Sequence, residues 1–179
     1  MALEELKVLG LKYAIGIGAC GSFSEKLQID DLIIADNAII SDGTSKEYSN
    51  CHEAGPSIKL LKMMEALLSN RNQAYKKACV WTLDAMYRET IEKMKRWRKS
   101  GAECVNMETG TFYTVSKELG IESIYLSFVL DLIHTEKWTG WGGLNDELKS
   151  KVESSKSYLE IVEGLAVELA REIKHTMLS

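Results

Sequence analysis

The chain has 179 residues, of which 45% are hydrophobic and 27% charged, and its formal net charge is -4. This length suits one domain with its own core, so we expect a single domain over residues 1–179. The sequence has no apolar run of the roughly 20 residues needed to cross a bilayer. It also has no broad basic field, so neither a membrane nor a nucleic acid is expected as a partner. Small molecules and other protein subunits remain.

The start of the chain and the cysteines bear on compartment and metal binding. No basic-then-apolar secretory pattern opens the sequence, so we expect a cytoplasmic protein. Cys20, Cys51, Cys79 and Cys104 are scattered and form no C-x-x-C pair, and the histidines lack the spacing of a zinc-binding helix. We therefore expect buried thiols and no metal site.

A helical segment, then a glycine, then an apolar strand recurs along the chain. The glycines of these units are Gly10, Gly101 and Gly120. A glycine just past a helix adopts the left-handed conformation that closes the last turn, and an apolar strand after it suits a sheet covered on both faces. The units predict helices at 3–9, 91–98 and 112–119, and strands at 13–17, 102–105 and 121–129.

Further elements lie between and after these units. Residues 32–40 and 78–82 predict strands, Pro56 begins a helix, and a final helix runs from about Asn145 to His175. The alternation indicates an α/β domain. Because the first element is a helix with no strand before it to begin a crossover, we expect the architecture to be N-terminally truncated.

The segment Gly16–Gly21 matches the G-x-G-x-x-G pattern of dinucleotide sites. Such a fingerprint must open a helix whose amides meet the pyrophosphate, yet residues 27–34 soon predict another strand. We therefore do not favour a dinucleotide. The glycines permit close approach either by a ligand or by another strand, and the sequence leaves both open.

Acidic residues follow two predicted strands. Met107 and Glu108 cross from a strand end into a helix start, the edge where α/β proteins place ligands. The carboxylate can accept hydrogen bonds from vicinal hydroxyls and the thioether can underlie a sugar; alternatively, Glu108 favours the helix dipole and Met107 is core. Asp131 follows the apolar run 124–130, where a carboxyl can act as a general acid or simply as a turn residue or cap.

A basic run lies in the predicted helix at 91–98 and extends just beyond it. It comprises Lys93, Lys95, Arg96, Arg98 and Lys99. Its simplest interpretation is a solvated helix face.

Five segments, in order, resemble the nucleoside phosphorylase family, which includes purine nucleoside and uridine phosphorylases. They are Gly18–Ser22, Asp42–Ser45, Asp84–Glu89, Val105–Thr109 and Val129–Asp131. The resemblance implies a central mixed, largely parallel sheet flanked by helices, and a homo-oligomer, either a dimer or a hexamer. It also implies a pentosyltransferase that cleaves the N-glycosidic bond of a nucleoside, with inorganic phosphate as co-substrate and no cofactor.

The resemblance implies roles for individual residues. Met107 and Glu108 match the family's ribose-binding pair, and Asp131 matches the acid that protonates the purine ring. Protonating the departing base while a carboxylate holds the ribose lowers the barrier to an oxocarbenium-like transition state. The implied base pocket is Thr82, Asp84, Met86 and Tyr87, and the implied phosphate-side loop is Gly18, Ala19, Cys20 and Gly21.

The sequence also departs from the family's pattern. Gly16 stands where many members carry a phosphate-binding Arg, and Ala19 replaces a hydroxyl residue. The opening strand and glycine loop, which supply a further Arg, have no counterpart. A phosphate dianion needs several donors to leave water. Thr90 and Glu92 stand where pyrimidine-specific members read uracil with Gln and Arg, which favours a purine.

The leading hypothesis is therefore a phosphorylase that converts a purine nucleoside into free base and ribose 1-phosphate. A nucleosidase using water is the second reading, because it needs no phosphate site. A catalytically impaired remnant that binds nucleosides or serves as an oligomer subunit is the third.

Overall fold

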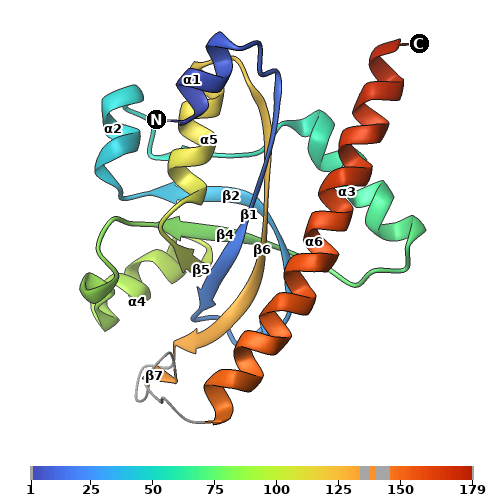
Figure 1. Cartoon of the computed structure of the whole chain (residues 1–179). Coiled ribbons are helices and arrows are strands. Elements are labelled where there is room, and N and C mark those ends of the chain that lie inside the picture. Colours follow the sequence, from blue (N-terminus) through green and yellow to red (C-terminus); the bar gives the residue numbers. More distant parts are fainter. Residues whose placement is uncertain (1, 134–137, 140–145, 179) are drawn as a thin grey trace.

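The structure is a computed structural model that describes residues 2–133, 138–139 and 146–178, with the side chains of the last helix described from Glu160 to Thr176. Figure 1 shows the chain. Its elements are α1 (Ala2–Val8), β1 (Tyr13–Ser22), β2 (Leu32–Ile40), α2 (Gly43–Tyr48), β3 (Glu53–Ala54), α3 (Ile58–Asn70), β4 (Lys76–Thr82), η1 (Met86–Arg88), α4 (Ile91–Lys99), β5 (Ala102–Asn106), α5 (Thr109–Glu118), β6 (Glu122–Ile133), β7 (Trp138–Thr139) and α6 (Asp146–Leu178).

Five of the strands close into a barrel. They follow the order β2-β4-β5-β1-β6, and β6 pairs back onto β2, while β3 and β7 extend the sheet. Three of the pairings in the barrel are parallel (β1–β6, β2–β4 and β4–β5) and two are antiparallel (β1–β5 and β2–β6). The predicted mixed, largely parallel sheet flanked by helices is confirmed. Its closure was not predicted.

The helix-glycine-strand units are confirmed. Gly10, Gly101 and Gly120 follow α1, α4 and α5, and their φ angles are +95°, +94° and +62°. Each glycine thus takes the left-handed conformation in which a side chain would be strained. The strands that follow, β1, β5 and β6, are three of the five strands of the barrel.

The other predicted elements are present with small shifts at their ends. The helix after Pro56 begins at Ile58, where the Ser57 side chain caps it by accepting a hydrogen bond from the Leu60 N–H at 3.3 Å. The final helix is described from Asp146, and the predicted start at Asn145 lies outside the described residues. None of the helices within the described ranges combines the length and apolar character that crossing a membrane requires.

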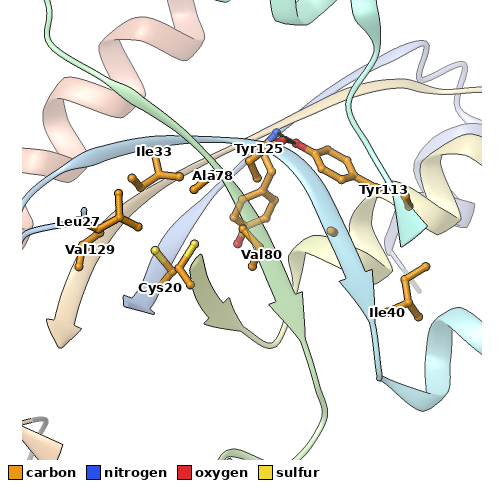
Figure 2. Close-up of a cluster of buried hydrophobic side chains, with 13 residues drawn as sticks. Cys20, Leu27, Ile33, Ile40, Ala78, Val80, Tyr113, Tyr125 and Val129 are labelled. Atoms are coloured by element: carbon orange, nitrogen blue, oxygen red, sulfur yellow. Dashed lines mark hydrogen bonds between the residues drawn. The ribbon is translucent and has the colours of Figure 1, made fainter. Parts of the chain in front are cut away.

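Side chains that alternate along the strands contribute to two hydrophobic clusters on opposite faces of the barrel wall. On β6, Ile124 and Leu126 join a cluster with residues of α3 and α6, on the outer face of the barrel. Tyr125 and Val129 face the opposite way, into a cluster with residues from all five strands of the barrel (Figure 2). Figure 1 shows α3 and α6 on one side of the barrel and α2, α4 and α5 on the other.

The prediction of buried thiols holds for two of the four cysteines. Cys20 and Cys104 are buried, Cys79 is intermediate, and Cys51 is exposed. The prediction was wrong for Cys51 because this residue lies outside the barrel strands, in the segment between α2 and β3.

Candidate functional site

The glycines of the G-x-G-x-x-G segment make room for a side chain of the neighbouring strand. Gly16, Gly18 and Gly21 all lie within β1, and Gly16 pairs with Tyr125 of β6. A Cβ on Gly16 would lie 2.2 Å from Tyr125 Cδ2, and one on Gly18 would lie 2.4 Å from Tyr125 Oη. The glycines are therefore needed for contact between strands. No helix opens after them, so the geometry of a dinucleotide site is absent from this segment.

Tyr125 is held on several sides. Its backbone N–H donates to Tyr113 Oη at 2.9 Å, and that hydroxyl donates to the Ala35 carbonyl at 2.6 Å (Figure 2). Its ring meets Phe112 edge-on, with 5.5 Å between centroids. Burial, followed by the nearby Glu108 charge, raises the pKa of Tyr125, so the phenol stays protonated. Within the described residues its hydroxyl makes no hydrogen bond, and the side chain is 4% exposed.

Met107 and Glu108 lie at the turn from β5 into α5, as predicted. The Asn106 side chain organises this turn: its Oδ1 accepts the N–H groups of Glu108 and Thr109 at 3.3 Å and 3.1 Å. Glu108 stands at the N-cap position without a capping bond, and its carboxylate accepts the Met107 N–H at 3.1 Å. Met107 is 44% exposed, so it is not a core residue. Glu108 is also exposed, at the positive end of the helix.

Strand register brings Asp131 close to this turn. Gly21 of β1 pairs with Val105 of β5 on one side and with Asp131 of β6 on the other. A Cβ on Gly21 would lie 3.1 Å from the Asp131 carboxylate, so the glycine leaves space beside that acid. Asp131 and the end of β5 therefore flank the same short stretch of β1.

Glu89 is an acidic neighbour of Asp131 that the sequence analysis missed. Burial, with a smaller contribution from the Asp131 charge, raises the pKa of Glu89 to about 7. A carboxyl with this pKa can both hold and release a proton near neutral pH. Sequence alone carries no signal for this pair, because the two residues are far apart along the chain.

The predicted base-pocket residues are divided between the interior and the surface. Thr82 is fully buried, and its Oγ1 accepts the Gly110 N–H at 2.8 Å, which fixes the start of α5. Asp84 is exposed and accepts the Gly43 N–H at 2.6 Å. Met86 and Tyr87, on η1, are 45% and 91% exposed. The structure thus brings Asp84, Met86 and Tyr87 onto one surface loop, with Thr82 beneath it.

The residues predicted as a phosphate-side loop lie in a strand instead. Gly18, Ala19, Cys20 and Gly21 belong to β1, which pairs with β6 along this stretch with a register shift between Cys20 and Gly21. The prediction of a loop was wrong because the glycines serve strand contact. Cys20 is buried in the barrel, and its thiol donates to the Phe128 carbonyl at 3.7 Å.

A buried carboxylate braces the helices behind the site. Asp42 is 0% exposed and caps α2 by accepting the Ser45 N–H at 2.6 Å. It also accepts the Ser45 hydroxyl at 2.9 Å and the Thr111 hydroxyl at 2.7 Å, which ties α2 to α5. Within the described residues, no group of three or more His, Cys, Asp or Glu side chains could hold a metal ion.

The fold and site together define an α/β protein with a closed mixed barrel and acidic residues gathered at the ends of β5 and β6. Over residues 1–165 the chain matches the model of the phosphorylase superfamily. The chain therefore belongs to this superfamily.

Several individual relatives and solved structures are similar to this chain. The chain is 29% identical to the DeoD-type purine nucleoside phosphorylase of Alkaliphilus metalliredigens, over 74% of this chain and 58% of the relative. The uridine phosphorylase of Vibrio fischeri superposes with a TM-score of 0.72 and 25% identity, over 94% of this chain and 66% of that one. The AMP nucleosidase of Bacteroides thetaiotaomicron shares the fold, with a TM-score of 0.61 and 23% identity over 85% and 63%. The chain thus spans only about two thirds or less of the length of each of these relatives.

Proposed function

We propose that this chain cleaves the N-glycosidic bond of a purine nucleoside, with phosphate as acceptor, to give free base and ribose 1-phosphate. Membership of the phosphorylase superfamily supports the reaction class, and the similarity to purine nucleoside phosphorylases supports the purine. The observation that carries the proposal is the register that places Asp131 and the end of β5 on either side of Gly21.

The proposed roles follow from exposure and position. Glu108 accepts hydrogen bonds from the ribose hydroxyls, with the exposed Met107 thioether against the sugar. Asp131, half-buried near the end of β6, donates a proton to the departing purine. Asp84, Met86 and Tyr87 surround the base from their surface loop. The assembly proposed is a homo-oligomer, which light scattering on the purified chain can test.

Replacing the ribose carboxylate tests the proposal. Glu108→Gln should weaken nucleoside binding at least about tenfold, because hydrogen bonds to a charged group contribute about 1.5–3 kcal/mol. Calorimetric titration with inosine and adenosine measures this. The matched control is Glu118→Gln, which removes an exposed carboxylate at the other end of the same helix. Equal affinity in the Glu108 variant and the unaltered chain would remove Glu108 from the site.

A nucleosidase that uses water is the second candidate, favoured by the contact between Gly16 and Tyr125. Many family phosphorylases carry a phosphate-binding Arg where this chain has Gly16. Here the ring of Tyr125 occupies the space beside that backbone, because a Cβ on Gly16 would already lie 2.2 Å from it. An Arg side chain at this position therefore has no room without a shift of Tyr125.

Release of base from a nucleoside panel, with and without phosphate, separates the candidates. Phosphorolysis requires that base release depend on phosphate and that ribose 1-phosphate form. Equal rates in both conditions would favour hydrolysis. No turnover of inosine, adenosine or uridine by intact protein would contradict both and favour a binding or subunit role.

A further inference from the structure

A pocket lies on the α4 side of the barrel. Its volume is about 260 Å³, it opens to solvent, and it is lined by the end of β4, the η1 turn and α4. Trp81 and Leu83 line it, whereas Thr82 between them faces α5 through its bond to Gly110. Because side chains alternate between the two faces of a strand, Trp81 faces this pocket and Thr82 faces the start of α5. Of the predicted nucleoside-site residues, only Asp84 also lines it.

Three cations converge on this pocket. They are Arg88 from η1, and Lys93 and Arg96 from α4. Lys93 and Arg96 are three residues apart and so share one face of the helix with Trp97, the next residue. The basic run on α4 is therefore not only a solvated helix face, because Lys93 and Arg96 of this run line the pocket. Lys95 and Lys99 do not line the pocket, and Arg98 lies over the Phe23 ring at 5.9 Å.

Among the described residues, Arg88, Lys93 and Arg96 form no salt bridge with a carboxylate. Asp84 is the one carboxylate among the described residues that line the pocket, and its Oδ2 accepts the Gly43 N–H at 2.6 Å. Three positive charges and one negative charge leave the lining with an excess of two positive charges, although the chain as a whole carries -4. Such an excess in a concave site attracts anions.

The walls orient the cationic groups and add a donor. The Arg96 guanidinium lies over the Trp97 ring, 4.8 Å from its centroid, and Trp97 packs against Trp81 with 6.2 Å between centroids. Trp81 Nε1 donates to Ser41 Oγ at 3.0 Å. Because Ser41 accepts that bond, its own hydroxyl proton can be donated into the pocket.

We propose that this pocket binds a compact phosphate dianion, either inorganic phosphate or a small phosphate monoester. The excess of two positive charges matches a dianion, and the guanidinium groups of Arg88 and Arg96 suit the geometry of phosphate oxygens. The volume lies below the roughly 300–1,000 Å³ typical of sites for drug-sized ligands, which favours a compact group. This proposal does not rest on the proposed nucleoside cleavage, although Asp84 belongs to both sets of residues.

Calorimetric titration of the full chain with inorganic phosphate and with methyl phosphate tests the proposal. The test variant carries Arg88→Gln and Arg96→Gln. The control carries Lys95→Gln and Lys99→Gln, which remove the same charge from exposed positions outside the pocket. We expect saturable binding that weakens at least about tenfold in the test variant and is retained in the control. A third variant with Lys at both Arg positions keeps the charge and should retain part of the affinity. Circular dichroism checks that each variant is folded.

The possible outcomes distinguish a site for inorganic phosphate from a site for phosphate monoesters, and both from the absence of a phosphate site. Binding of both probes identifies a site for monoesters, and binding of inorganic phosphate alone identifies a site for the free ion. The proposal is overturned if the unaltered chain shows no saturable binding, if the test variant binds as well as the unaltered chain, or if both double variants lose affinity equally. A loss of nucleoside turnover without a change in this binding would bear on the proposed function alone.

Discussion

At the scale of single residues, Glu89 beside Asp131 shows how the surroundings of a carboxyl group change its pKa. Both are carboxylic acids at the end of a loop or strand, and neither is unusual in the sequence. Partial burial and the charge of its neighbour shift Glu89 into a range where its protonation state changes near neutral pH. Such pairs are characteristic of functional sites, although ion-pair networks also produce them.

Glu89 should make stability depend on pH. Its pKa in the folded protein, about 7, lies above its ordinary value of 4.5, so the folded state binds the proton more tightly than the unfolded state. The linked stability is fully present below about pH 4.5 and is lost as the pH rises through about 7. Glu89→Gln should therefore flatten the profile and stabilise the protein at about pH 8 by on the order of 1 kcal/mol, after allowing for solvent screening.

Urea unfolding across this pH range measures the effect. The matched control is Glu92→Gln, at an exposed position three residues further along the chain. An unchanged profile in the Glu89 variant would show that its carboxyl titrates normally in the folded protein.

At the scale of elements, the contact between β1 and β6 depends on the absence of side chains. The phenol of Tyr125 reaches Gly18, and its ring covers Gly16. The two strands are parallel neighbours from Tyr13 and Glu122 onward, so an added Cβ cannot turn away from this contact. Even a single added methyl group on Gly16 or Gly18 should therefore disturb the packing of these two strands.

Gly18→Ala should destabilise the protein by about 1–3 kcal/mol through overpacking. The added Cβ would lie 2.4 Å from Tyr125 Oη, so Tyr125→Phe in the same chain should recover part of the loss. Thermal and urea unfolding give the values. Gly164→Ala is the control, because a Cβ there meets nothing within 4 Å and α6 should gain roughly 0.5–1 kcal/mol from it. If Gly18→Ala proved neutral, the proposed clash with Tyr125 would not exist.

Much of the local structure could be predicted from sequence because its causes are local. Gly10, Gly101 and Gly120 mark helix ends through their own conformational freedom, and the placement of Glu108 and Asp131 follows from strand ends. Closure of the barrel could not be predicted, since it depends on β2 pairing with the distant β6. The same limit applies to Tyr125 and Glu89, whose significance comes from residues on other strands.

At the scale of the whole molecule, one helix covers the outer face of the barrel. Val162, Leu165, Leu169 and Ile173 of α6 are buried in a cluster that also contains Leu60 of α3. An ion pair between Arg71 and Glu168 joins the end of α3 to α6. Between Glu160 and Thr176, where its side chains are described, the helix therefore packs against the outer face of the barrel, on the same side as α3 (Figure 1).

Leu169→Ala should cost about 2–5 kcal/mol, because the side chain is 0% exposed and its removal leaves a cavity between helix and barrel. Val167→Ala, at a position 51% exposed on the same helix, should change stability by no more than about 0.5 kcal/mol. Denaturant unfolding compares the two. Similar small losses in both variants would indicate that α6 does not dock as described.

The contact between Gly16 and Tyr125 also constrains how related sequences can vary. A longer side chain at position 16 and a ring at position 125 compete for the same space, so the two positions should change together. Relatives with an Arg at the position of Gly16 should carry a smaller residue opposite it, and relatives with an aromatic residue there should keep the glycine. Substituting Arg at position 16 alone would then yield an unstable protein, whereas exchanging both residues at once offers a route to a cation at this end of the barrel.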